Sequence, residues 1–194
     1  GRAVIPVKRT GVAAWMVVVL ISMVSAAKAD SERVLRTMQI HQVKELGLEI
    51  WTEQDPLWDT ELTSSRGRAV FRAETPGNNY PPAGMTWAVP GVRFSEREFA
   101  EGARGAVHQA ARNYGLQEQQ LSQLQLRPAK YGSLSGYECD FPADAEGVPV
   151  DVRVFFGHIP GSPAVAMQVY TLKGKLAHIS EHIRRSWSNV RYLN

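Results

Sequence analysis

A short apolar run near the start of the chain has the features of a cleavable export signal, and it sets the conditions under which the rest must fold. Two basic residues precede the apolar residues 12–24, and Ala27-Lys28-Ala29 then matches the small-x-small pattern that signal peptidase accepts. As a helix, this run would span only about 20 Å, whereas the hydrocarbon core of a membrane is roughly 30 Å thick. We therefore predict cleavage after Ala29, with residues 1–6 upstream of the signal. An uncleaved membrane anchor is the alternative.

The predicted signal carries all of the excess positive charge of the chain. The whole sequence has 22 basic and 19 acidic side chains, and four of the basic ones but none of the acidic ones lie before Asp30. Cleavage would leave 18 basic against 19 acidic side chains, a net charge of −1. A nucleic-acid-binding domain normally has a clustered basic footprint. The composition therefore gives no support to a nucleic acid as the partner.

An exported chain of this composition must be held together by packing. Residues 30–194 are predicted to form a single domain, which is long enough to bury an ordinary hydrophobic core. Cys139 is the only cysteine, so it has no partner for an internal disulfide, and its position disfavours a lipid anchor at the predicted cleavage point. Apolar and charged residues alternate around it. We expect Cys139 to point inward from a strand, beside Tyr137 and Phe141, as an inert buried thiol.

The first part of the predicted domain has the pattern of short strands. Residues 37–52 have the alternation of a β-hairpin broken at Gly47, and residues 68–74 alternate again. The stretch 75–84 is rich in proline, glycine and asparagine and predicts a surface loop. A short strand over 85–89 is expected to follow.

A long helix is predicted to begin after Ser95 and to pack on a sheet. Ser95 and Glu98 form an S-x-x-E capping box, and Phe94 and Phe99 occupy the hydrophobic-staple positions on either side of the cap. Gly115 is placed to end the helix. The apolar stripe along the helix consists of Phe99, Ala103, Ala106, Val107, Ala110 and Tyr114.

The remaining chain has the pattern of antiparallel strands closed by a helix. Residues 117–126 predict a short helical turn that leads into a strand. Strands are predicted over 134–141, 148–157 and 164–172, with turns short enough for consecutive antiparallel pairing. Residues 175–187 carry apolar side chains at helical intervals. This order predicts an α+β fold, in which a central antiparallel β-sheet is covered by helices.

The closing helix contains a possible metal motif. His178-Ile179-Ser180-Glu181-His182 matches H-x-x-E-H, in which two histidines four apart share a helix face and a glutamate can act as base. The same residues also have the spacing of the solvent side of an amphipathic helix. We predict the solvent side, with no catalytic residue, no metal and no cofactor. A small zinc-dependent hydrolase that uses His178, Glu181 and His182 is the alternative.

Two features are the best candidates for binding a partner. The first is an aromatic, proline-rich loop together with a tryptophan earlier in the chain, since tyrosine and tryptophan give a large contact area at low entropic cost. The tryptophan could instead pack in the core. The second is the basic C-terminal end, whose charges also suit a helix C-terminus. The predicted partner-binding residues are Trp58, Asn79, Tyr80, Pro81, Arg184 and Arg185.

A family resemblance rests on four segments. They are Gly47-Leu48-Glu49-Ile50-Trp51 leading to Pro56-Leu57-Trp58, then Phe94-Ser95-Glu96-Arg97-Glu98-Phe99, then Leu134-Ser135-Gly136-Tyr137-Glu138-Cys139, and a final strand–helix pair ending near Trp187. With this layout, the chain from about residue 45 onward resembles the PsbP-like superfamily. That superfamily includes the photosystem II extrinsic protein, a Ran-binding nuclear import factor and many bacterial envelope proteins. The resemblance implies an α/β/α sandwich whose members mostly bind proteins, and it supplies no shared catalytic set.

These features together favour an exported, non-enzymatic protein-binding domain of the Gram-negative periplasm. More narrowly, export, small size and aromatic loops are typical of an immunity protein that neutralises an antibacterial effector, such as one delivered by type VI secretion. A general envelope maintenance factor without a toxin partner is a further alternative. In each case the expected partner is a protein, and no stable membrane anchor remains after cleavage.

Export should yield a mature protein that begins at Asp30, because signal peptidase cleaves after the small residue that ends the motif. N-terminal sequencing or the intact mass of the periplasmic protein measures this. A product that retains the apolar run would contradict cleavage and favour the membrane anchor.

Overall fold

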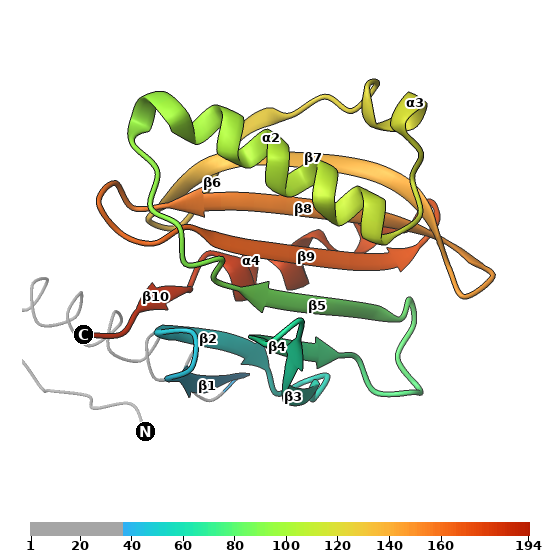
Figure 1. The fold of residues 1–194 in the computed structure, drawn as a ribbon. Coiled ribbons are helices and arrows are strands. Elements are labelled where there is room, and N and C mark those ends of the chain that lie inside the picture. The colour runs from blue at the N-terminus through green and yellow to red at the C-terminus, as the bar shows by residue number, and fades with distance from the viewer. Residues whose placement is uncertain (1–36) are drawn as a thin grey trace, which may run out of the picture. The chain divides into compact units, whose positions relative to one another are not determined.

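The computed structural model describes residues 37–194, of which Gln39–Asn194 form one compact unit (Figure 1). The predicted signal and its cleavage site lie outside the described residues. Within the described part of the chain, no helix is both long enough and apolar enough to cross a membrane.

Two sheets make up most of this unit. The larger sheet has seven strands, all paired antiparallel, in the order β3-β4-β5-β9-β8-β7-β6, and the smaller sheet has the order β1-β2-β10. The strands of the smaller sheet are β1 (Met38–Val43), β2 (Leu48–Glu53) and β10 (Arg191–Tyr192). Those of the larger sheet are β3 (Asp59–Ser65), β4 (Arg68–Glu74), β5 (Ala83–Ala88), β6 (Arg127–Tyr131), β7 (Leu134–Ala145), β8 (Val148–His158) and β9 (Val165–Leu172).

Helices lie on both faces of the larger sheet. Helix α2 (Glu96–Asn113) crosses one face over β7 and β8, and the short α3 (Glu118–Leu121) follows it (Figure 1). On the opposite face, a 3-10 turn (Leu176–Ile179) and α4 (Ser180–Trp187) share one core with the smaller sheet. The fold is α+β, as predicted. The sequence does not predict, however, that a second sheet covers part of the face opposite α2.

The residues around Ser95 determine where α2 begins and confirm the predicted cap. Ser95 Oγ accepts a hydrogen bond from the Glu98 N–H at 3.3 Å, and the rings of Phe94 and Phe99 meet edge-on with their centroids 6.1 Å apart. The helix ends where expected, because Gly115 adopts a φ of +89° that other residues rarely accept.

The alternation of side chains along β8 supplies both faces of the larger sheet. Val152 and Val154 join Cys139 and Phe141 in a core under α2, whereas Phe155 belongs to the core on the opposite face. This follows from the two-residue period of a strand. It also confirms that Cys139 is a buried thiol, and burial raises the pKa of that thiol.

The closing helix is shorter than the prediction over 175–187. Its first residues form the 3-10 turn, and only Ser180–Trp187 is α-helical. The fully buried Trp187 holds α4 on the sheet, since its ring contacts Tyr131 and Phe155 at centroid distances of 5.1 and 6.4 Å.

Strand β3 is not predicted by the sequence analysis. Its residues are polar apart from Leu62, and nearly all of them are exposed, so no apolar alternation marks the strand. It forms because Arg66 and Gly67 both adopt positive φ, as a type I′ turn requires, and this turn pairs β3 with β4.

The sheet leaves no room for a side chain at Gly136. A Cβ there would meet the backbone carbonyl of Phe156 on β8, whereas a Cβ at Gly105 in α2 would meet nothing within 4 Å. We expect Gly136→Ala to destabilise the domain by about 1–3 kcal/mol through the forced backbone shift. Gly105→Ala should stabilise it by up to about 1 kcal/mol, because alanine favours the helix. Denaturant unfolding measures both, and equal destabilisation by the two substitutions would contradict this packing.

Candidate functional site

The aromatic loop, residues 78–82, is exposed and held by hydrogen bonds. Tyr80 is 70% exposed, and Lys175 Nζ lies 5.9 Å from the centroid of its ring. Asn79 Nδ2 donates to the carbonyl of Pro81 at 3.3 Å, and Thr171 Oγ1 of β9 donates to the next carbonyl of the loop at 2.8 Å. Hydrogen bonds within the loop and to the sheet therefore hold the backbone that carries the exposed Tyr80.

Trp58 is not part of this exposed surface. The sequence analysis expected it to be exposed for binding a partner, and that expectation of exposure is wrong. Its side chain is buried in the core opposite α2, and its ring meets His182 edge-on at a centroid distance of 5.9 Å. The chain folds back just before it, where Gln54 and Leu57 form an isolated antiparallel bridge. This turn directs Trp58 inward, so it supports the fold.

A buried carboxylate connects the end of β2 to α4. The side chain of Glu53 is only 3% exposed, and its oxygens contact His182 Nδ1 and Arg185 Nη1, the latter at 3.2 Å. These contacts offset the cost of burying a charge. Arg184 instead pairs with Glu181 across one helical turn at 2.7 Å. Both predicted arginines thus have intramolecular partners.

The residues of the H-x-x-E-H motif are not gathered at one point. His178 is exposed in the 3-10 turn, whereas His182 lies in α4 beside Glu53. His182 is partly buried, so the expectation that it lies on the solvent side of the helix is wrong. The change of helix type between the two histidines also removes the common α-helical face that the motif assumes. Among residues 37–194, no three His, Cys, Asp or Glu side chains are grouped to hold a metal ion.

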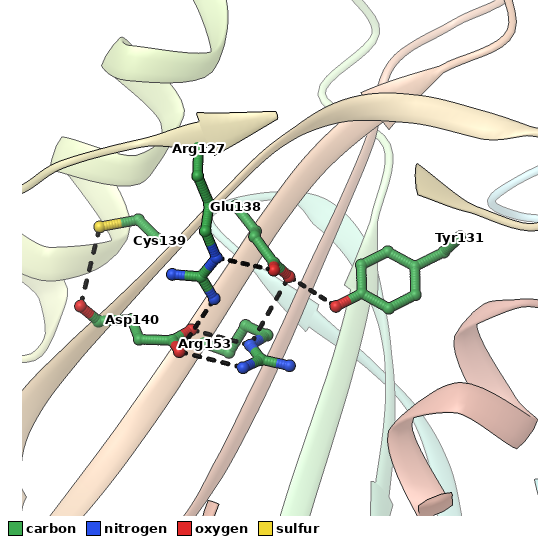
Figure 2. A network of polar contacts seen from close by, with 6 residues as sticks. All are labelled: Arg127, Tyr131, Glu138, Cys139, Asp140 and Arg153. Atoms are coloured by element: carbon green, nitrogen blue, oxygen red, sulfur yellow. Dashed lines mark hydrogen bonds and ion pairs between the residues drawn. The ribbon is translucent and has the colours of Figure 1, made fainter. Parts of the chain in front are cut away.

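Figure 2 shows a second polar cluster, which the sequence analysis misses. It lies on the face of the larger sheet opposite Cys139, and we call it the charge network. The network joins β6, β7 and β8 and consists of Arg127, Tyr131, Glu138, Asp140 and Arg153. Arg127 donates to Glu138 at 2.9 Å and to Asp140 at 3.0 Å, and Tyr131 donates to Glu138 at 2.5 Å. Arg153 donates to both oxygens of Asp140, at 2.8 and 3.0 Å.

The charge network shifts the pKa values of Asp140 and Tyr131 in opposite directions. Burial by itself would raise the pKa of Asp140, but the hydrogen bonds and charges of Arg153 and Arg127 outweigh burial and lower it. Burial, followed by the hydrogen bond to Glu138, raises the pKa of Tyr131. Near neutral pH, the two arginines therefore face an ionised Asp140, and the phenol of Tyr131 stays neutral. The signal in the sequence was two acidic residues at i and i+2 of a strand, but only the pairing of β6 and β8 with β7 identifies their arginines.

Comparisons with known proteins bear on the fold. No family model matches the sequence, and no curated protein matches it. A protein from Bacteroides thetaiotaomicron VPI-5482, solved by crystallography, matches with a TM-score of 0.51 at 10% sequence identity. The match covers 81% of this chain and 49% of that protein, so this chain spans about half of the neighbour's length. At this identity the likeness concerns the fold alone.

Neutralising Asp140 should destabilise the domain near neutral pH. Because its folded-state pKa is lowered, the ionised carboxylate contributes stability above the unfolded-state pKa of about 4, and this contribution is lost as the pH falls through the lowered value. We expect Asp140→Asn to cost about 1–3 kcal/mol at pH 7, with a smaller difference from wild type in acid. Denaturant unfolding between pH 3 and 7 measures this.

The matched control is Glu101→Gln, which neutralises an exposed carboxylate of α2 outside the charge network. We expect it to change the free energy of unfolding by no more than about 0.5 kcal/mol at any of these pH values. If Asp140→Asn lowers the free energy of unfolding by the same amount at every pH, the charge of Asp140 is not the cause of the loss.

Proposed function

We propose that the mature chain is an exported, non-enzymatic protein-binding domain of the periplasm. More narrowly, we propose an immunity protein that neutralises an antibacterial effector, such as one delivered by type VI secretion. The observation that carries the proposal is Tyr80, a large aromatic side chain that the aromatic loop holds out into solvent. The export signal predicted from the sequence supports the compartment.

The surroundings of Tyr80 suit a binding anchor. A tyrosine combines a large apolar contact area with a polar hydroxyl, and it loses little side-chain entropy when it is covered. The hydrogen bonds of Asn79 and Thr171 hold the loop before any partner arrives, which lowers the ordering cost of binding. Lys175, beside the ring, adds a cation that could meet an acidic group of the partner.

We also propose that the fold is a PsbP-like α/β/α sandwich. The support is the placement of α2 on one face of the antiparallel larger sheet and of α4 on the other. A protein-binding role agrees with what that resemblance implies for most members.

A competition between sibling strains tests the immunity role. A strain that lacks this gene is grown on a surface with its parent, and in parallel with a parent whose secretion apparatus is inactive. We expect the deletion strain to be killed only by the secretion-competent parent, because only that strain delivers the effector. Expression of the exported chain in the deletion strain should restore survival. Survival of the deletion strain against both parents would overturn the immunity role.

Tyr80→Ala should weaken this protection. Loss of a central aromatic anchor typically reduces affinity by about 10- to 100-fold. The measurement is survival of the deletion strain that expresses the variant at wild-type periplasmic levels, checked by immunoblot. Val92→Ala is the matched control, because it truncates another exposed apolar side chain outside the aromatic loop. Full protection by Tyr80→Ala, at equal protein levels, would show that the aromatic loop is not the binding site.

A further inference from the structure

The outer strand β3 of the larger sheet is unusually open. It pairs with β4 on one side, and among the described strands it has no neighbour on the other. Six of its seven residues are exposed, and Leu62 at its centre keeps 43% of its surface in solvent. An open strand edge is a template for pairing with another chain.

The register of the β3–β4 hairpin shows which backbone groups face outward. Ser65 and Arg68 flank the two-residue turn and exchange hydrogen bonds, as such a turn requires. Hydrogen-bonded pairs then alternate along the ladder. The N–H and C=O groups of Thr60, Leu62 and Ser64 therefore point away from β4, along the free edge.

The opposite edge of the same sheet is protected against pairing. Strand β6 is only five residues long. Tyr131 and Leu134 flank its turn, and alternation of hydrogen-bonded pairs from there leaves the backbone groups of Pro128 and Lys130 facing outward. Proline has no N–H to donate, and an edge lysine discourages strand addition. Strand β3 contains neither proline nor lysine. The two edges of one sheet are thus built differently.

The charges along β3 are separated by sign. Asp59 and Glu61 lie near its start, and Arg66 lies in the turn at its end. Within residues 37–194, none of these three has an ion-pair partner. Such an edge is complementary to itself in the antiparallel orientation, in which the acidic end of one copy meets the basic end of another.

We propose that β3 pairs with β3 of a second copy of this chain, antiparallel, about a two-fold axis at Leu62. Leu62 then lies opposite Leu62 of the second copy, and Thr60 lies opposite its Ser64. All outward-facing groups find partners. Asp59 lies opposite Ser65 of the second copy, one residue before its Arg66. A shift of the axis to residue 61 would place two Glu61 carboxylates opposite each other, which is unfavourable. The larger sheets of the two copies become one continuous sheet.

This dimer does not rest on the proposed immunity role, because it is argued from β3 and not from Tyr80. A protein that is monomeric in vitro would not contradict the immunity role. Survival of the deletion strain against both parents would not contradict the dimer.

Sedimentation of the exported protein over a concentration series tests the proposal. We expect a monomer–dimer equilibrium for the wild type. Leu62→Lys should weaken dimerisation at least 10-fold, because it places two like charges opposite each other, while an exposed edge strand accepts lysine without loss of fold. Val148→Lys is the matched control, because Val148 is 46% exposed at another turn, and it should dimerise like the wild type. Circular dichroism verifies that both variants are folded.

Charge reversal distinguishes this register from any other interface. Asp59→Arg and Arg66→Glu should each weaken dimerisation, and the double variant should recover it, because the attraction between the two strand ends is restored with the charges exchanged. A protein that stays monomeric at all concentrations would overturn the proposal. A dimer that is insensitive to Leu62→Lys, or a double variant without recovery, would also overturn it.

Discussion

The pairing of β7 with β8 is the interaction on which the rest of the structure depends. The two strands are in register from Ser135 and His158 to Ala145 and Val148, the longest ladder of the larger sheet. Because side chains alternate along both strands, this one ladder supplies the apolar floor under α2 and, on its other face, Phe155 for the core around Trp187. The same alternation places Glu138 and Asp140 beside each other, so the charge network is a direct product of the ladder.

Several carboxylates at the borders of the cores are paired with cationic or histidine side chains. Glu53 is neutralised by α4, and the acidic residues of β7 are neutralised by arginines of β6 and β8. Buried or half-buried charges would otherwise cost stability. The exposed groups stand apart from these clusters: Tyr80 on its loop, and the open edge of β3 with its separated charges. We propose binding at these two places and not at the paired clusters.

Much of the fold could be predicted from local pattern. The cap and staple at Ser95 and the end of α2 at Gly115 appear as expected, because they involve residues close together in sequence. Strand β3 could not be predicted, since it buries almost nothing and its sequence lacks an apolar period. The exposure of Trp58 was misjudged for a related reason. A local loop pattern shows that the chain turns, but it does not show toward which face the turn directs a side chain.

By itself, the sequence determined the α+β class, the limits of α2, the buried state of Cys139 and the exposed aromatic loop, because periodicity and capping act over a few residues. Only the tertiary structure decided which charges meet. It placed the two histidines of the H-x-x-E-H motif in helices of different type. It also gave His182 and Arg185 to Glu53, and it placed two arginines from different strands on the acidic pair of β7. Coulomb and hydrogen-bond interactions depend on distances across the fold, and strand order sets those distances between residues that lie far apart in the chain.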